Sequence, residues 1–81
     1  MTKKQFIEKY ADTTLQFQYY YKYEFTFVSL TEKITVCVGG DKDDIYRAGI
    51  DQEMKLKDLI HETGDEYVKV VIEGDYIEFD D

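Results

Sequence analysis

The feature that most constrains the fold is the segment LQFQYYYKYEFTFV, residues 15–28, where seven aromatic rings fall within eleven residues. Apolar or aromatic side chains occupy every odd position, and the even positions are mostly polar. A period of two residues is that of a β-strand with one buried face, and aromatic side chains favour strands. We therefore predict one long strand over residues 14–29. Tyr20 is the one ring on the polar face, and we expect it to be exposed.

A second strand is predicted over residues 33–38, KITVCV, where aliphatic side chains again alternate. If Phe27 lies opposite Val36, then Phe25 lies opposite Val38, and the apolar faces of the two strands coincide. A slip of one residue would put these faces on opposite sides, so the pattern fixes the register of an antiparallel pair. A short turn is enough to connect the two strands.

Two further segments repeat their apolar residues with the period of an amphipathic helix. The first spans residues 2–12, where Thr2 and Gln5 have the spacing of a capping box. The second spans residues 53–63, with a start that the pattern places only approximately. Between the second strand and the second helix, residues 45–50 have the composition of a short strand.

The C-terminal sequence EYVKVVIEGDYIEFDD is typical of a hairpin. We predict strands over residues 66–73 and 76–80, with a turn at Gly74–Asp75 that places Ile72 opposite Ile77. Because strands linked by hairpins form antiparallel sheets, the sequence predicts an α+β fold. We expect an antiparallel sheet of about four to five strands, with both helices packed on one side.

Length and cysteine content bound the organisation of the chain. At 81 residues it is expected to form a single globular domain, residues 1–81. Cys37 is the only cysteine, so no internal disulfide can form, which favours a reducing compartment. No apolar run approaches the ~20 residues of a membrane span, and the N-terminus lacks the apolar region of a secretory signal. We therefore expect a cytoplasmic protein with no membrane partner.

Negative charge is concentrated in the second half of the chain. The formal net charge is −8. Residues 1–40 carry five lysines and four acids and sum to +1, whereas residues 41–81 carry five basic and fourteen acidic side chains and sum to −9. Such a field repels nucleic acid and anionic membranes and attracts cationic surfaces. Acidic surfaces also keep small proteins soluble, a role that needs no partner.

The aromatic segment has two alternative interpretations besides a core strand. Proteins that stack nucleic-acid bases combine aromatic side chains with a positively charged groove. Only Lys22 lies inside this segment and the chain is acidic, so we interpret the alternating rings as one face of the core and expect no direct nucleic-acid contact. A long strand with exposed tyrosines is also suited to joining two copies, so a homodimer through the aromatic strand is the alternative function.

No motif predicts catalysis, a cofactor or a metal. The DKDD loop that begins at Asp41 has Ile45 and Tyr46 where a calcium loop needs an oxygen ligand and a glycine. His61 and Cys37 are 24 residues apart, and no set of nucleophile, base and orienting group can be assigned. We therefore expect a binding protein that is not an enzyme, and a small enzyme or metal-binding domain is the least favoured class.

The acidic side chains themselves are the predicted interaction surface. Carboxylates spaced along loops and strands can imitate a phosphate backbone and occupy the arginine- and lysine-lined groove of a basic nucleic-acid-binding protein. In size and charge alone, the chain resembles phage-encoded nucleic-acid mimics as a class, among them anti-CRISPR proteins, which are small, acidic and without catalytic residues. We therefore predict an anti-defence inhibitor of a basic partner protein. The predicted contact residues, with two tyrosines as aromatic anchors, are Asp41, Asp43, Asp44, Asp65, Glu66, Glu73, Asp75, Glu78, Asp80, Tyr20 and Tyr76.

Overall fold

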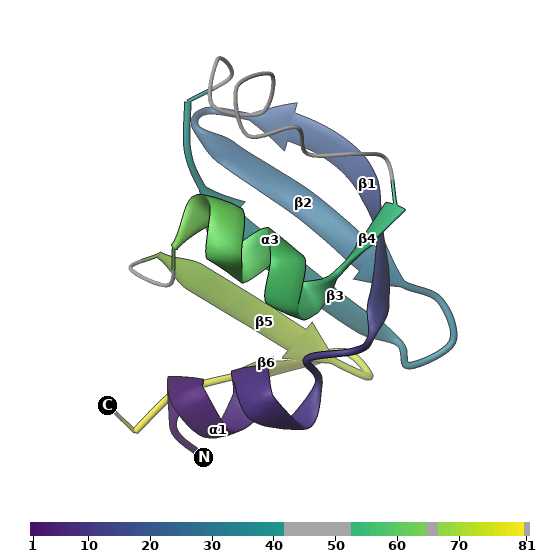
Figure 1. Cartoon of the computed structure of the whole chain (residues 1–81), viewed down its shortest axis with the longest axis vertical. Coiled ribbons are helices and arrows are strands. Elements are labelled where there is room, and N and C mark those ends of the chain that lie inside the picture. The colour runs from purple at the N-terminus through teal and green to yellow at the C-terminus, as the bar shows by residue number, and fades with distance from the viewer. Residues whose placement is uncertain (42–52, 65–66, 81) are drawn as a thin grey trace.

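The chain folds as an antiparallel sheet with two helices on one face (Figure 1). The computed structural model describes residues 1–41, 53–64 and 67–80, and the predicted strand over residues 45–50 lies outside them. Within the described residues the sheet has six strands in the order β4-β1-β2-β3-β5-β6. This confirms the predicted α+β fold, with more strands than expected. The elements are α1 (Lys3–Lys9), β1 (Thr14–Tyr21), β2 (Glu24–Ser29), β3 (Ile34–Gly39), β4 (Glu53–Lys55), α3 (Leu56–Thr63), β5 (Val68–Ile72) and β6 (Asp75–Ile77).

The predicted single strand over residues 14–29 is wrong, because the chain reverses at Lys22 and Tyr23. Both residues have positive φ angles, 47° and 64°, as a two-residue turn between twisted strands requires. Neither is a glycine or an asparagine, so the sequence carries no ordinary signal for this turn. The reversal converts one aromatic segment into two paired strands and brings both halves against the same small core.

A β-bulge in β1 inverts the predicted orientation of its second half. The pairing of β1 with β2 shifts between Phe17 and Tyr19, which leaves Gln18 as an extra residue. Beyond this bulge Tyr20 turns toward the core, where it is half-buried with its ring centroid 4.6 Å from that of Phe25. The prediction that Tyr20 is exposed on the polar face is therefore wrong.

The register of β2 with β3 is the one predicted. Phe27 lies opposite Val36, and Phe25 lies opposite Val38. All four side chains are fully buried on the face that the helices cover. Burying one large apolar side chain contributes about 1.5–3 kcal/mol, so this pairing is a major part of the core. The buried core as a whole comprises Phe6, Leu15, Phe25, Phe27, Ile34, Val36, Val38, Leu56, Leu59 and Val70.

Both helices are shorter than predicted. α1 begins with the predicted capping box, in which the Gln5 backbone N–H donates to the Thr2 hydroxyl at 3.1 Å and the Thr2 N–H donates to the Gln5 side chain at 2.8 Å. Residues 53–55, which were predicted as helix, instead form β4 and pair with β1. Met54 lies opposite Leu15 there and packs against the core, so strand pairing overrides the local helical pattern.

The C-terminal hairpin forms with a register that differs from the prediction. Its turn lies at Glu73–Gly74, where both residues have positive φ angles, so Val70 rather than Ile72 lies opposite Ile77. β6 ends at Ile77, and beyond it the ring of Phe79 packs on Phe6 of α1. The displacement is by two residues, so the side chains keep their faces even though their partners change.

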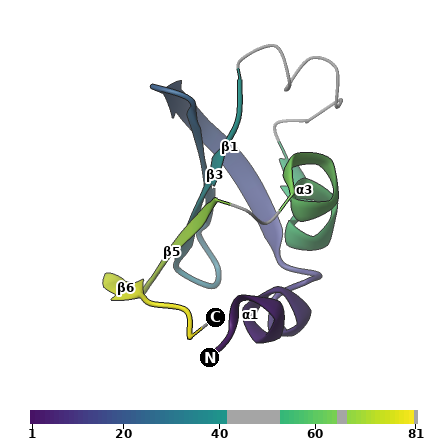
Figure 2. The same ribbon diagram turned by 90° about the vertical axis from the view of Figure 1, so that its left-hand side faces the viewer.

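The edge-on view in Figure 2 shows α1 and α3 together on one side of the sheet. No described helix or strand covers the other side. The two ends of the chain lie close together, and the N-terminal ammonium is 3.1 Å from the Asp80 carboxylate. In the described part of the chain, no helix combines the length and the apolar character that crossing a membrane demands.

Candidate interaction surface

The sheet face that the helices leave uncovered carries a group of tyrosines. Along each strand, side chains alternate between the core and this side, and the strand pairing aligns them in rows. The surface therefore combines residues from five strands. We define it, as the open face, by Gln16, Tyr19, Tyr21, Glu24, Thr26, Val28, Thr35, Cys37, Tyr67, Lys69, Val71 and Tyr76.

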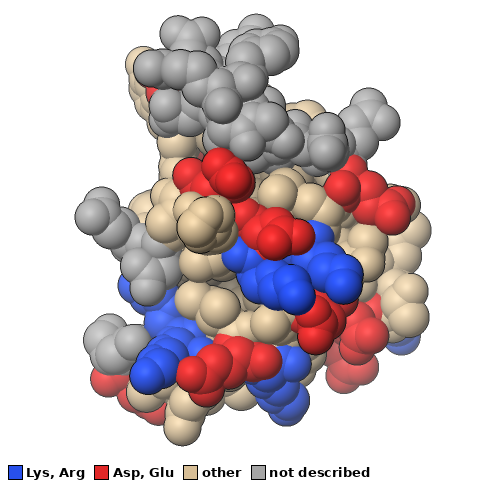
Figure 3. Space-filling view, viewed as in Figure 1, with Lys and Arg blue, Asp and Glu red and all other residues tan. Residues whose placement is uncertain are grey.

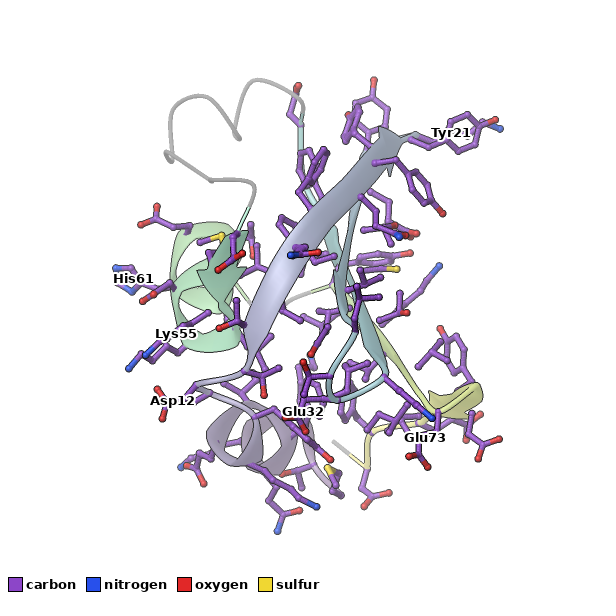
Figure 4. The ribbon with its side chains drawn as sticks, turned by 90° about the vertical axis from the view of Figure 1, so that its right-hand side faces the viewer. Asp12, Tyr21, Glu32, Lys55, His61 and Glu73 are labelled. Atoms are coloured by element: carbon purple, nitrogen blue, oxygen red, sulfur yellow. The ribbon has the colours of Figure 1, made fainter. Side chains whose placement is uncertain are left out.

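Three tyrosines are the most exposed aromatic side chains of the open face. The exposed fractions of Tyr19, Tyr21 and Tyr76 are 56%, 63% and 61%. Figure 4 shows Tyr21 and Glu73 on the side away from the helices, whereas His61 lies on the helix side. Exposed aromatic side chains are among those that most often contribute binding energy at protein interfaces.

Glu24, Tyr67 and Lys69 form a fixed polar group within the open face. The Tyr67 hydroxyl donates to the Glu24 carboxylate at 2.8 Å, and the Lys69 ammonium lies 3.2 Å from the same oxygen. The Tyr67 ring lies against Gly39, where an added Cβ would come within 3.1 Å of the ring. The hydrogen bond from Tyr67, followed by the interaction with Lys69, lowers the pKa of Glu24, so this carboxylate is ionised at neutral pH.

The predicted acidic residues that the structure describes lie at two opposite ends of the sheet, with Asp41 at one end and the acids of the C-terminal hairpin at the other. Asp41 follows β3 beside the β1–β2 turn, where the Gly40 N–H donates to the Tyr23 carbonyl at 2.9 Å. Glu73 lies at the other end of the sheet, where its N–H donates to the Lys33 carbonyl at 2.9 Å. Four of the predicted acids lie outside the described residues: Asp43, Asp44, Asp65 and Glu66.

Three acids of the C-terminal hairpin have no cationic partner among the described residues. Glu73, Asp75 and Glu78 are exposed and make no ion pair there, and we call them the hairpin acids. Asp80 differs, because it pairs with the N-terminal ammonium. The exposed Tyr76 lies between the hairpin acids in sequence, so this hairpin presents carboxylates beside an aromatic ring.

The helix-bearing face has a mixed charge by comparison. Figure 3 shows lysines and acids side by side over it. The ammonium groups of Lys57 and Lys55 lie 3.0 and 3.8 Å from the Asp12 carboxylate. The hydrogen bond from Lys57 is the main cause that lowers the pKa of Asp12. Charges on this face therefore offset one another, whereas those of the hairpin acids do not.

Cys37 and His61 lie on opposite sides of the sheet. Cys37 is on the open face, with its Sγ 3.6 Å from the Thr26 hydroxyl oxygen, and burial raises the pKa of its thiol. His61 is exposed on α3 (Figure 4). The two side chains therefore cannot act together on one substrate. Within residues 1–41, 53–64 and 67–80, no three His, Cys, Asp or Glu side chains gather as metal ligands do.

The two predicted aromatic anchors have different environments. Tyr76 is exposed on the open face, whereas Tyr20 faces the core. The sequence pattern placed Tyr19 and Tyr21 on the apolar face of the strand, because the bulge that turns them outward has no recognisable sequence signal. Tyr67 was also missed, although the alternation along β5 places it on the same side as the other outward residues of that strand.

β1 lies inside the sheet, between β4 and β2, rather than at an edge. The edge strands of the described sheet are β4 and β6, and each has only three residues. Two copies cannot pair through the Thr14–Gln16 part of β1 while β4 occupies that side. Among the described residues, no strand pairs with residues 17–21 of β1 on that side.

Comparison with protein-family models, with curated proteins and with solved structures finds no match for this chain. The open face and the hairpin acids are therefore interpreted from the chain's own geometry and charge.

Proposed function

We propose that the protein is a cytoplasmic binding module that inhibits a basic nucleic-acid-binding protein by occupying its nucleic-acid site. The observation that carries this proposal is the set of three exposed hairpin acids, which have no cationic partner among the described residues. The net charge of −9 over residues 41–81 supports the same conclusion. An anti-defence inhibitor of the kind that phages encode fits this chemistry.

Binding would depend on charge at two ranges. At long range, the net charge of −8 attracts a cationic groove over roughly one Debye length, about 8 Å at physiological salt. At contact, the hairpin carboxylates pair with arginine and lysine side chains that otherwise hold phosphates. Both effects weaken as salt is added, as the binding of nucleic acid to the same groove also does.

Affinity capture with a DNA competitor tests this proposal. The full chain is immobilised and exposed to a nuclease-treated bacterial lysate at low and high salt. We expect a basic nucleic-acid-binding protein to be retained at low salt, and to be released by high salt or by added duplex DNA. The proposal is contradicted if no such protein is retained at low salt, or if duplex DNA does not release it.

A matched pair of charge reversals locates the contact. The double variant Glu73→Lys/Glu78→Lys removes two hairpin acids, and Glu8→Lys/Glu62→Lys makes the same change in net charge at exposed acids of the helices. We expect the hairpin variant to lose about tenfold in affinity for the captured protein, and the helix variant to lose much less. Equal losses would mean that only the overall charge matters and that the hairpin acids have no special role.

A further inference from the structure

The open face exposes aromatic rings from β1 to the edge strand β6. Tyr19 on β1 and Tyr76 on β6 are separated by three strands, which corresponds to about 20 Å at the usual strand spacing. The residues between them, such as Val28 and Val71, are smaller and half-buried. An extended peptide of six or seven residues is long enough to cross this distance.

Two rings of the open face already have a cation over them. The Lys22 ammonium lies 5.2 Å from the centroid of the Tyr21 ring, and the Lys69 ammonium lies 5.3 Å from that of Tyr67. Cations within about 6 Å of a ring centroid are attracted by the negative face of the ring. These two tyrosine rings of the open face therefore already accept a cation over the ring from the chain's own lysines.

Tyr76 has no such lysine over its ring among the described residues and instead lies next to uncompensated carboxylates. Tyr76 follows Asp75 and lies near the β5–β6 turn that contains Glu73, and neither acid makes an ion pair with a described residue. Arginine matches this combination better than lysine, because a guanidinium both stacks on aromatic rings and binds carboxylates through two parallel hydrogen bonds.

We infer that the open face is the docking surface for an arginine-rich segment of the partner, whose guanidinium groups stack on Tyr19, Tyr21 and Tyr76 and pair with Glu73. This inference rests on the proposed function, since it names the surface that meets the basic partner. It assigns the main contact to the sheet face and not to the acids alone.

Single-stranded nucleic acid is the competing occupant of an aromatic sheet face. Such proteins stack successive bases on exposed rings, but they surround the rings with positive charge. Here the net charge is −8, and Lys69 of the open face is already paired with Glu24. Charge complementarity therefore favours the cationic peptide.

Nuclear magnetic resonance of the full chain with labelled tyrosines tests the inference. The probes are a capped decapeptide of alternating Gly and Arg, its Gly–Lys counterpart, and the oligonucleotide dT10. We expect the arginine peptide to shift the ring signals of Tyr19, Tyr21 and Tyr76, and to leave those of the inward-facing Tyr10 and Tyr20 unchanged. The lysine peptide should bind about three- to tenfold more weakly, and dT10 should cause no shift.

Ring-deleting and ring-keeping variants provide the control. Tyr19→Ala/Tyr76→Ala should weaken binding of the arginine peptide by about tenfold, whereas Tyr19→Phe/Tyr76→Phe should stay within about twofold, because the rings remain. Both positions are exposed, so thermal melting should show that all three proteins, the unmutated chain and the two double variants, are folded to the same extent.

The outcomes separate this inference from the proposed function. If the two peptides bind equally and shift only the amide signals of the hairpin acids, the open face is not the docking surface. The proposed binding of a basic partner through the hairpin acids is then unaffected. If the arginine peptide binds the tyrosines but lysate capture yields no DNA-competed protein, the surface stands and the nucleic-acid mimic is wrong. If dT10 shifts the tyrosine rings instead, both are overturned.

Discussion

The two faces of the sheet have opposite characters although the same strands build them. On the inner face Phe25, Phe27 and Val36 are completely buried, whereas Tyr19 and Tyr76 on the open face expose more than half of their surface. Because side chains alternate along a strand, one aromatic segment supplies both faces. One aromatic-rich segment therefore serves two roles, since four of its seven rings face the core and the other three are exposed to a partner.

The largest expected effect contrasts one ring from each face. Phe27→Ala should reduce the free energy of unfolding by about 3–5 kcal/mol, because it leaves a cavity beside the ring of Phe17, and a domain of this size has little more stability than that. Tyr76→Ala should cost less than about 1 kcal/mol. Urea unfolding followed by circular dichroism measures both, and similar losses would contradict the assignment of the faces.

The reversal at Lys22 and Tyr23 is what makes two strands out of the aromatic segment. Replacing these residues with Asn and Gly, which tolerate the positive φ angles found there, should raise the free energy of unfolding by about 1 kcal/mol. Replacing both with Ala should lower it, because Ala is strained at positive φ. A stabilising effect of the Ala pair in the same unfolding experiment would argue against this turn.

The bulge at Gln18 can be tested by deleting that residue. Without it, Phe17 and Tyr20 still point inward and Tyr19 still points outward, so the deletion should cost about 1 kcal/mol or less. In a continuous strand, the same deletion would turn every later side chain to the wrong face. A decrease of several kcal/mol in the free energy of unfolding would therefore contradict the bulge and support regular alternation through Gln18.

The smallest expected effect concerns the carboxylate within the open face. The pKa of Glu24 is lowered from its ordinary value of 4.5, so its contribution to stability is present above that pH and disappears as the pH falls through the lowered pKa. Glu24→Gln should cost about 0.5 kcal/mol at pH 7, since this pair is partly exposed and solvent screens it. Melting temperatures of the two proteins should converge as the pH falls through the lowered pKa of Glu24, and a constant difference would exclude this ion pair as the cause.

Much of the inner face could be predicted because it follows from volume and periodicity. The pairing of Phe27 with Val36 is the one register in which the large apolar side chains meet, and the structure has it. The turn at Lys22–Tyr23 could not be predicted, because both residues have positive φ angles although neither is of a type that favours them. The three residues of β4 were missed for a related reason, since tertiary pairing outweighed a local helical pattern.

The candidate site was harder to predict than the fold. Net charge pointed to a cationic partner, and the structure leaves the hairpin acids exposed. The open face was not foreseen, because one extra residue at Gln18 exchanges the orientations of Tyr19 and Tyr20. A bulge costs little energy and has no fixed sequence, so alternation alone cannot locate it.

The central claim is that this protein and nucleic acid compete for one site on a basic partner. Equilibrium binding of the captured partner to labelled duplex DNA, measured by fluorescence anisotropy at several fixed concentrations of the full chain, tests it most directly. We expect the apparent Kd for DNA to rise in proportion to the concentration of the chain without reaching a plateau, and Glu73→Lys/Glu78→Lys to shift this effect to about tenfold higher concentrations. A ternary complex, with the partner holding DNA and this chain together at an unchanged Kd, would contradict it.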